Sequence, residues 1–233
     1  RAWIFTSATL AVAGDFSHYT SALGLGDVAA GCWDSPFDYG TQALLCVPRG
    51  LPEPNQPAHT DAVVDAALPV IEAAGGRAFL LFTSLRALAA ARERLAAAFA
   101  SRGLGFPMLV QGERSKTELL ERFRRLGNAV LLGSASFWEG VDVPGPALSL
   151  VVIDKLPFAV PSDPLVSARM DWVNGTGGNA FAEYQVPMAI LTLKQGLGRL
   201  IRSKSDRGVV AVLDSRLSTM AYGKRFVKSL PPY

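Results

Sequence analysis

Four unbroken apolar runs constrain the fold of this chain more than any other feature. Each is rich in β-branched residues or Leu and ends on polar residues or glycine: "RAFLLFTS" (77–84), "NAVLLGSAS" (128–136), "LSLVVIDKLPF" (148–158) and "RGVVAVLD" (207–214). Unbroken hydrophobicity is typical of strands that are covered on both faces, as in a parallel sheet. Two weaker runs, "TQALLCVP" (41–48) and "FPMLVQG" (106–112), are candidate strands of the same kind. We also expect a strand at Trp3 to Thr6.

Helical patterns lie between these runs. One spans about Thr60 to Ala74, and the next begins after Ser84 as N-cap and ends at Gly103 as C-cap. The remaining two are "KTELLERFRRLG" (116–127) and a segment from about Ala182 to Arg202. Strands that alternate with helices of ten or more residues predict an α/β fold, with a mainly parallel central sheet flanked by helices.

The basic charge is concentrated in two blocks. Residues 77–125 carry ten basic and four acidic side chains, and residues 194–233 carry nine and two, although the net charge is only +3. Such blocks are typical of proteins that bind a polyanion, and solvated helix faces produce the same pattern. The chain has no apolar run of about 18 residues and no export signal. Its only cysteines, Cys32 and Cys46, are not spaced as metal ligands, which is typical of a protein of the reducing cytosol.

Two arginines stand out in the last predicted helix. Thr192, Gln195, Arg199 and Arg202 follow the spacing i, i+3, i+7 and i+10, so on a continuous helix they form one polar stripe on an otherwise apolar surface. Gly196 and Gly198 remove side chains beside this stripe, which suggests close approach of another surface. Guanidinium groups in such a place favour phosphate oxygens as partners, whereas the alternative is a solvent-facing or salt-bridged stripe.

The segment "QGLGRLIRSKSDRGVVAVLDSR" resembles motif VI of the DinG/XPD-like superfamily 2 DNA helicases, closest to the bacterial DinG-type branch. The resemblance then extends along the chain. It includes "WIFTSATL" (3–10) as motif III, "AFLLFTSLRAL" (78–88) as motif IV, "LLGSASFWEGVDVPGPALSLVVIDKLPF" (131–158) as motif V with its following strand, and "YGKRFVKSLPPY" (222–233) as the C-terminal ending. Five blocks in the family order are far more specific than any one of them.

The resemblance implies the second RecA-like domain of such a helicase, a P-loop-NTPase-type domain that lacks its own Walker A. No GxxxxGK[ST] motif and no Asp-Glu pair occur in the sequence. We therefore expect residues 1–10 to form a motif III edge of the preceding domain, and residues 11–233 to form the second domain, with a proline-rich connector at 47–57. Because the chain starts on Arg1, we expect it to be part of a longer protein. The family places most of the ATP and Mg²⁺ site, and any iron–sulfur cluster, in the other half.

The resemblance also implies roles for individual residues at the nucleotide. Arg199 and Arg202 would reach towards the terminal phosphates of ATP, with Gln195 beside them and Arg202 as the arginine finger. In motif V, Gly140 would permit a tight turn that places Glu139 and Asp142 near the same edge. Ser7 and Thr9 of motif III would couple the ATP state to the grip on DNA.

Single-stranded DNA is expected to cross the opposite rim. Hydroxyl, amide or glycine residues follow three of the predicted strands there, where they can contact phosphates without reading the sequence. These residues are Thr83, Ser84, Gln111, Gly112, Ser134 and Ser136. Phe137 and Trp138 are candidates to stack on bases, although an aromatic pair beside a strand more often belongs to the core.

The overall prediction is the C-terminal motor domain of an ATP-dependent 5′→3′ DNA helicase with a role in DNA repair, monomeric and cytoplasmic at the nucleoid. Its expected partners are single-stranded DNA and the N-terminal RecA-like domain of the same protein. The first alternative is a non-catalytic nucleic-acid-binding module. The second is a nuclease, which needs clustered carboxylates for metal ions, and Asp142, Asp154 and Asp163 are not grouped in the sequence.

Overall fold

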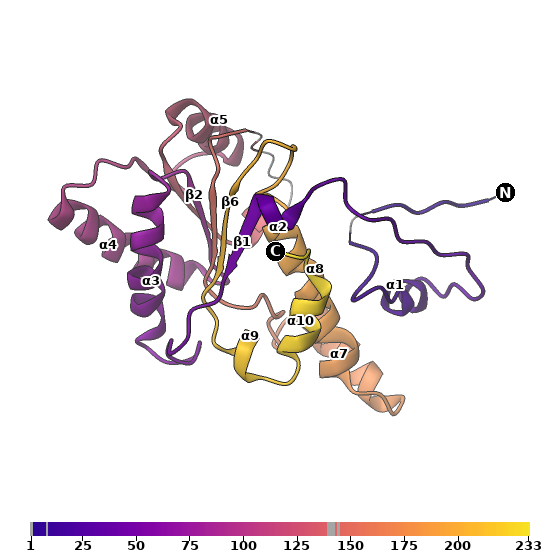
Figure 1. Cartoon of the computed structure of the whole chain (residues 1–233). Coiled ribbons are helices and arrows are strands. Elements are labelled where there is room, and N and C mark those ends of the chain that lie inside the picture. Colours follow the sequence, from indigo (N-terminus) through magenta and orange to yellow (C-terminus); the bar gives the residue numbers. More distant parts are fainter. Residues whose placement is uncertain (1, 8, 139–142, 144) are drawn as a thin grey trace.

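The computed structural model describes residues 2–7, 9–138, 143 and 145–233. Its centre is a six-stranded parallel sheet with the strand order β1-β6-β5-β2-β4-β3 (Figure 1). The strands are β1 (Ala43–Cys46), β2 (Ala78–Leu81), β3 (Met108–Val110), β4 (Val130–Gly133), β5 (Leu150–Ile153) and β6 (Gly208–Val212). The prediction of an α/β fold with a parallel sheet is confirmed, because each of the six apolar runs from residue 41 onwards contains one strand.

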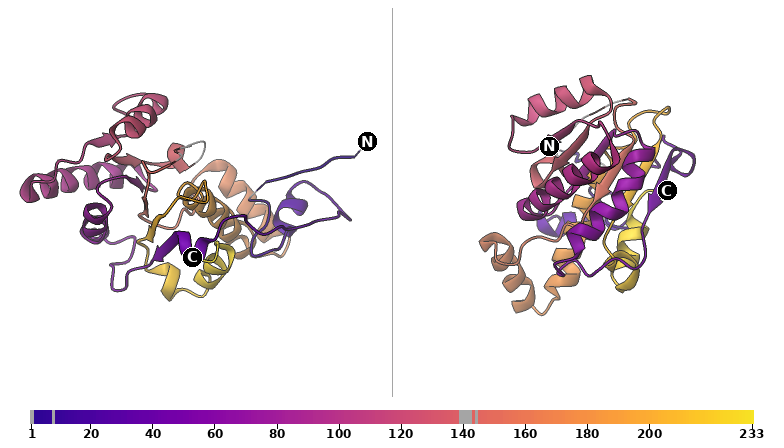
Figure 2. Two further views of the ribbon diagram at one scale, coloured as in Figure 1. Left: turned by 45° about the horizontal axis from the view of Figure 1, so that its top comes forward. Right: turned by 90° about the vertical axis from the view of Figure 1, so that its left-hand side faces the viewer.

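Helices cover both faces of this sheet (Figures 1 and 2). They are α1 (Ser17–Ala22), α2 (Tyr39–Gln42), α3 (His59–Ala73), α4 (Leu85–Arg102), α5 (Lys116–Leu126), α6 (Ala135–Trp138), α7 (Pro164–Gly175), the π-helix η1 (Phe181–Gln185), α8 (Val186–Leu197), α9 (Arg216–Thr219) and α10 (Gly223–Ser229). None of the helices in the described part of the chain is long and apolar enough to cross a membrane.

The core has two layers, one on each face of the sheet. Alternate side chains of a strand point to opposite faces, so Leu80 packs with helices α3 and α4, whereas Leu81 packs with α5, α8 and α10. Both leucines are fully buried. Burial of such a side chain stabilises the fold by about 1.5–3 kcal/mol. This explains why strands β2, β4 and β5, which are buried at every position, contain no polar side chain.

The predicted ends of two helices are confirmed. The Ser84 side chain accepts a hydrogen bond from the Ala87 amide at the start of α4, and Gly103 ends that helix with a φ of 66°. Helix α5 begins after Ser115, whose side chain accepts from the Glu118 amide, and it ends at Gly127 with a φ of 69°. Glycine adopts this left-handed conformation without the steric cost that a Cβ atom imposes.

The prediction of a strand near the N-terminus is wrong. Trp3 to Thr6 do not form a strand, and Trp3 and Ile4 are more than 80% exposed. A strand needs a neighbouring strand to pair with, and this segment runs away from the sheet (Figures 1 and 2). The turn-rich stretch at 160–179 contains helix α7, in which Asp163 caps the N-terminus by accepting from the Leu165 and Val166 amides. The connector at 47–57 contains neither a helix nor a strand.

Candidate nucleotide and nucleic-acid edges

The residues predicted to contact DNA meet at one edge of the sheet. Strands β2, β4 and β3 are neighbours and run parallel, so the residues that follow their carboxyl ends lie side by side. Thr83 and Ser84 follow β2, Gln111 and Gly112 follow β3, and Ser134 and Ser136 follow β4. In parallel α/β sheets this is the edge at which ligands bind.

Ser84 is the donor best placed for an outside partner. Its hydroxyl oxygen caps helix α4 by accepting from the Ala87 amide at 3.2 Å, and the side chain is exposed. The hydroxyl proton therefore stays available while the cap is formed. The first turn of an 18-residue helix adds a favourable dipole for an anion at the same point.

Thr83 is bound to a buried carboxylate. Its amide donates to Oδ1 of Asp154 at 3.0 Å, and its hydroxyl donates to Oδ2 at 3.4 Å. Burial raises the pKa of Asp154 to about 7, whereas the charge of Lys155 and the bonds from Thr83 act in the opposite direction. A phosphate contact from the Thr83 hydroxyl would have to replace its 3.4 Å bond to Asp154.

Gln111 and Ser134 form a pair across β3 and β4. Oε1 of Gln111 accepts from the Ser134 amide at 2.6 Å and from the Ser134 hydroxyl at 3.1 Å. Since a backbone amide can only donate, the oxygen of Gln111 must face Ser134, and the amino group faces the other way. No described residue accepts from that amino group, so it offers two donors at this edge.

The last two residues of this set are exposed. Gly112 has a φ of 96°, which suits the turn between β3 and α5. Ser136 has an exposed side chain, and its carbonyl accepts from the ammonium group of Lys116. In contrast, Phe137 and Trp138 are only 1% and 2% exposed, so they belong to the core and do not stack on bases.

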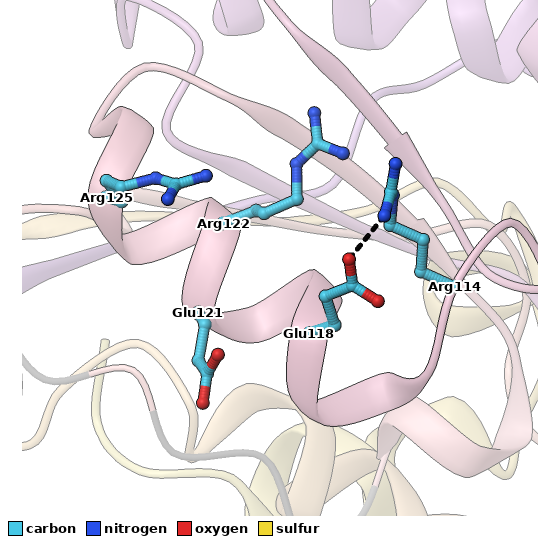
Figure 3. Close-up of a pocket in the computed structure, with 5 residues that line it drawn as sticks. All are labelled: Arg114, Glu118, Glu121, Arg122 and Arg125. Carbon is cyan, nitrogen blue, oxygen red and sulfur yellow. Dashed lines mark hydrogen bonds and ion pairs between the residues drawn. The ribbon is translucent and has the colours of Figure 1, made fainter.

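A groove lies on helix α5, which follows strand β3 and this edge in the chain. It is lined by Arg114, Glu118, Glu121, Arg122 and Arg125 and has a volume of about 420 Å³. The three guanidinium groups lie on one side of the helix, Glu118 pairs with Arg114, and Glu121 points away (Figure 3). Helix α5 starts a few residues after Gly112, so the groove runs from near the polar edge along the helix and carries three arginines and two glutamates.

The arginines of the predicted stripe lie beyond the helix. Helix α8 ends at Leu197, so the prediction of a helix to Arg202 is wrong. Closely spaced glycines have low helix propensity, and the Leu200 amide bonds to the Leu197 carbonyl at 3.1 Å, which tightens the chain into a turn. Gln195 is therefore helical, whereas Arg199 sits in this turn and Arg202 in the loop that leads to β6. A Cβ atom on Gly198 would lie 3.1 Å from the carbonyl oxygen of Lys194, which belongs to the preceding turn of the same helix.

The loop that carries Arg202 is held by two buried side chains. The carboxylate of Asp206 accepts from the Arg202 amide at 2.7 Å and from the Ser203 amide at 2.8 Å. The amino group of Gln42 donates to the Ser203 carbonyl at 2.8 Å and to the Asp206 carbonyl at 3.1 Å. Because this loop precedes β6 and Gln42 precedes β1, the loop lies at the amino edge of the sheet, opposite the strand ends described above.

Of the other predicted site residues, the structure describes Ser7, Thr9 and Gln195. Ser7 and Thr9 contact each other, with 3.2 Å between their hydroxyl oxygens, in the segment that runs away from the sheet (Figure 1). Glu139, Gly140 and Asp142 lie outside the described residues. Among the described residues, no group of His, Cys, Asp and Glu could hold a metal ion.

The fold and both edges define a class of protein. A parallel sheet flanked by helices, without a phosphate loop of its own, is an α/β RecA-like domain of the second, C-terminal kind. The family described as "Helicase C-terminal domain" matches residues 67–233, and the chain belongs to this family. Its resemblance to the DinG/XPD-like superfamily 2 helicases is thereby confirmed.

Comparisons with known proteins agree with this assignment. The chain is 50% identical to the "ATP-dependent DNA helicase YoaA" of Escherichia coli over 230 residues, which are 99% of this chain and 35% of that protein. It is 43% identical over 236 residues to the "ATP-dependent helicase DinG" of Mycobacterium tuberculosis, covering 99% of this chain and 34% of the other. The chain thus spans about a third of the length of the curated relatives it matches. A solved structure titled "XPD_APO" has the same fold, with a TM-score of 0.62 and 19% identity over 80% of this chain and 38% of the other.

Proposed function

We propose that this chain is the C-terminal motor domain of an ATP-dependent DNA helicase with 5′→3′ polarity. Residues 1–10 would belong to the edge of a preceding RecA-like domain, which would hold most of the ATP and Mg²⁺ and any iron–sulfur cluster. The names of the relatives support the helicase activity. The observation that supports the proposal is that polar side chains able to bind phosphate gather after the carboxyl ends of β2, β3 and β4, while buried Asp206 and Gln42 hold the main chain of the loop that carries Arg202.

Arg202, Arg199 and Gln195 belong to the proposed nucleotide site. Arg202 acts as the arginine finger, with Arg199 and Gln195 beside it. Glu139, Gly140 and Asp142 would belong to the same nucleotide site, as the family resemblance suggests. Guanidinium groups that enter a shared cleft stabilise the charge on a transferring phosphoryl group. ATP would therefore close the cleft between the two domains, and hydrolysis would reopen it.

We call the carboxyl ends of β2, β3 and β4 the DNA edge. Single-stranded DNA is held there through its phosphates. The donors are the Ser84 hydroxyl, the Gln111 amino group and the exposed residues Gly112 and Ser136, while Thr83 and Ser134 support them from within. Phosphate contacts of this sort fix the strand without sequence preference. Ser7 and Thr9 would couple both edges once the preceding domain is in place.

The experiment that tests the proposal replaces Arg202 in the full-length protein. Arg202→Ala should lower ATP turnover on the order of a thousandfold and leave the affinity for single-stranded DNA nearly intact. Lys204→Ala is a matched control, because Lys204 is an exposed cation of the same loop. Wild-type turnover in Arg202→Ala would contradict the proposal. DNA binding without any ATP hydrolysis by the wild type would instead support a non-catalytic binding module.

A further inference from the structure

Trp138 contacts the DNA edge with its side chain. The indole Nε1 donates to the carbonyl oxygen of Phe82 at 3.4 Å, and Phe82 directly precedes Thr83 and Ser84 at the end of β2. The side chain is only 2% exposed, so it is enclosed by its own domain. A shift of the β2 end would therefore move the acceptor of the indole N–H.

The main chain of the same residue contacts an arginine of the proposed nucleotide site. The carbonyl oxygen of Trp138 accepts a hydrogen bond from Nη2 of Arg199 at 3.3 Å. Trp138 is the last residue of the short helix α6, which begins directly after the β4 strand end. One residue thus touches both the segment that carries the DNA donors and an arginine of motif VI.

The indole of Trp138 packs closely against helix α8. A Cβ atom on Gly196 would lie 2.8 Å from Cε3 of Trp138, a distance that real contacts do not show. Glycine in a helix interior costs about 1 kcal/mol relative to alanine, and this contact gives a physical reason to accept that cost. The sequence predicted close approach of another surface at Gly196, and that surface is the ring of Trp138.

We infer that Trp138 is a positioning residue that links the DNA edge to Arg199 and so couples DNA binding to ATP hydrolysis. The inference rests on the proposed function. When a strand binds at the end of β2, the Phe82 carbonyl and the indole move together. Because the ring is wedged against Gly196, which lies three residues before Arg199, helix α8 and the Arg199 guanidinium follow. Coupling between two binding events is reciprocal, so bound nucleotide changes the affinity for DNA by the same factor by which bound DNA changes the affinity for nucleotide.

Three variants of the full-length protein test this inference. Trp138→Phe keeps an aromatic ring but lacks the N–H donor and leaves a gap beside Gly196. Gly196→Ala keeps the indole but displaces it from helix α8. Phe137→Leu is the control, because Phe137 is equally buried in α6 but packs on Gly133 and Lys116 instead. The readouts are the affinity for a single-stranded oligonucleotide with and without a non-hydrolysable ATP analogue, and ATP turnover with and without that oligonucleotide.

We expect Trp138→Phe and Gly196→Ala to reduce the effect of the analogue on DNA affinity, and the stimulation of turnover by DNA, by about tenfold. DNA affinity without nucleotide should change less than about twofold. Phe137→Leu should lower the melting temperature but keep both ratios. Wild-type ratios in the two test variants would overturn the inference, and so would an equal loss of both ratios in Phe137→Leu. A wild-type protein that neither binds the oligonucleotide nor hydrolyses ATP would overturn the proposed function itself.

Discussion

The carboxylate of Asp206 accepts the backbone amide of Arg202 at 2.7 Å, so a buried acid fixes the main chain of the residue proposed as arginine finger. Gln42 fixes the same loop from the other side through two carbonyl oxygens. Gln42 also accepts from the Asp38 amide at 3.0 Å, which ties the loop to the segment that precedes β1. The position of Arg202 is thus determined by residues that carry no chemistry of their own.

Removal of the Asp206 carboxylate should release this loop. In Asp206→Ala two amides lose their acceptor, and we expect the free energy of unfolding to fall by about 2–4 kcal/mol. In the full-length protein ATP turnover should fall by at least about tenfold, because a small misplacement of a catalytic group is costly. Asp206→Asn keeps an oxygen acceptor, so its free energy of unfolding and its ATP turnover should fall much less. Urea denaturation and steady-state kinetics check this, and equal turnover in all three proteins would contradict it.

A second buried acid predicts a large effect on stability. Asp214 is fully buried, and Arg216 pairs with it through Nη2 at 2.7 Å, while the Leu156 amide donates to the same carboxylate at 2.7 Å. Arg216→Ala leaves a buried charge without its counterion and should lower the free energy of unfolding by about 3–5 kcal/mol. The double variant Asp214→Asn/Arg216→Ala should recover part of this loss, as chemical denaturation can show. A double variant less stable than Arg216→Ala would argue against charge burial as the cause.

Much of the fold was predictable because its signals are local. The strands are apolar on both faces since helices cover both, and Ser84 and Gly103 mark the ends of α4 through interactions with their own helix. The predicted strand at Trp3 to Thr6 was wrong because pairing depends on a neighbour that the sequence of the segment does not contain. Its apolar residues are exposed in this structure.

The site was only partly predictable for the same reason. The polar residues at strand ends were visible, since parallel strands bring their ends together. The end of α8 was missed because hydrophobic periodicity continues through Leu200 and Ile201, although the chain has already turned at Gly198. The role of Gln42 could not be predicted from the sequence around it, because its partners Ser203 and Asp206 lie more than 160 positions away. Asp206 stands in a turn-like sequence, which was the one available hint.

The buried carboxyl group of Asp154 predicts a dependence of stability on pH. Burial raises its pKa from 3.8 to about 7, so the native state holds this proton more tightly than the unfolded chain does. The contribution of this group to the free energy of unfolding is therefore fully present below about pH 4, and it is lost as the pH rises to about 7. Asp154→Asn removes the titration and keeps an acceptor for the Thr83 amide. As the pH rises from about 4 to about 7, the free energy of unfolding of the variant should increase relative to that of the wild type by up to about 4 kcal/mol, as measured by urea denaturation. A constant difference across this range would contradict the prediction.

The groove on helix α5 predicts a salt-dependent contribution to DNA binding. Arg122 and Arg125 line one groove on α5, the helix that follows Gln111 and Gly112 in the chain (Figure 3). If both contact phosphates, their replacement by alanine should reduce the slope of log affinity against log salt by about 1.4, at roughly 0.7 for each contact with a single strand.

The matched control removes the same charge from the opposite face of the sheet. Arg94 and Arg102 of α4 pair with Asp65 and Glu72 of α3, each at 2.8 Å, and these helices cover the other layer. The double variant Arg94→Ala/Arg102→Ala therefore changes the net charge equally but should leave the slope within about 0.3 of the wild type, because distant exposed charges are screened. Equal slopes in the two double variants would mean that the groove acts only through overall charge. A reduced slope in the α5 variant alone would place the strand along α5, since only direct phosphate contacts release counterions one by one.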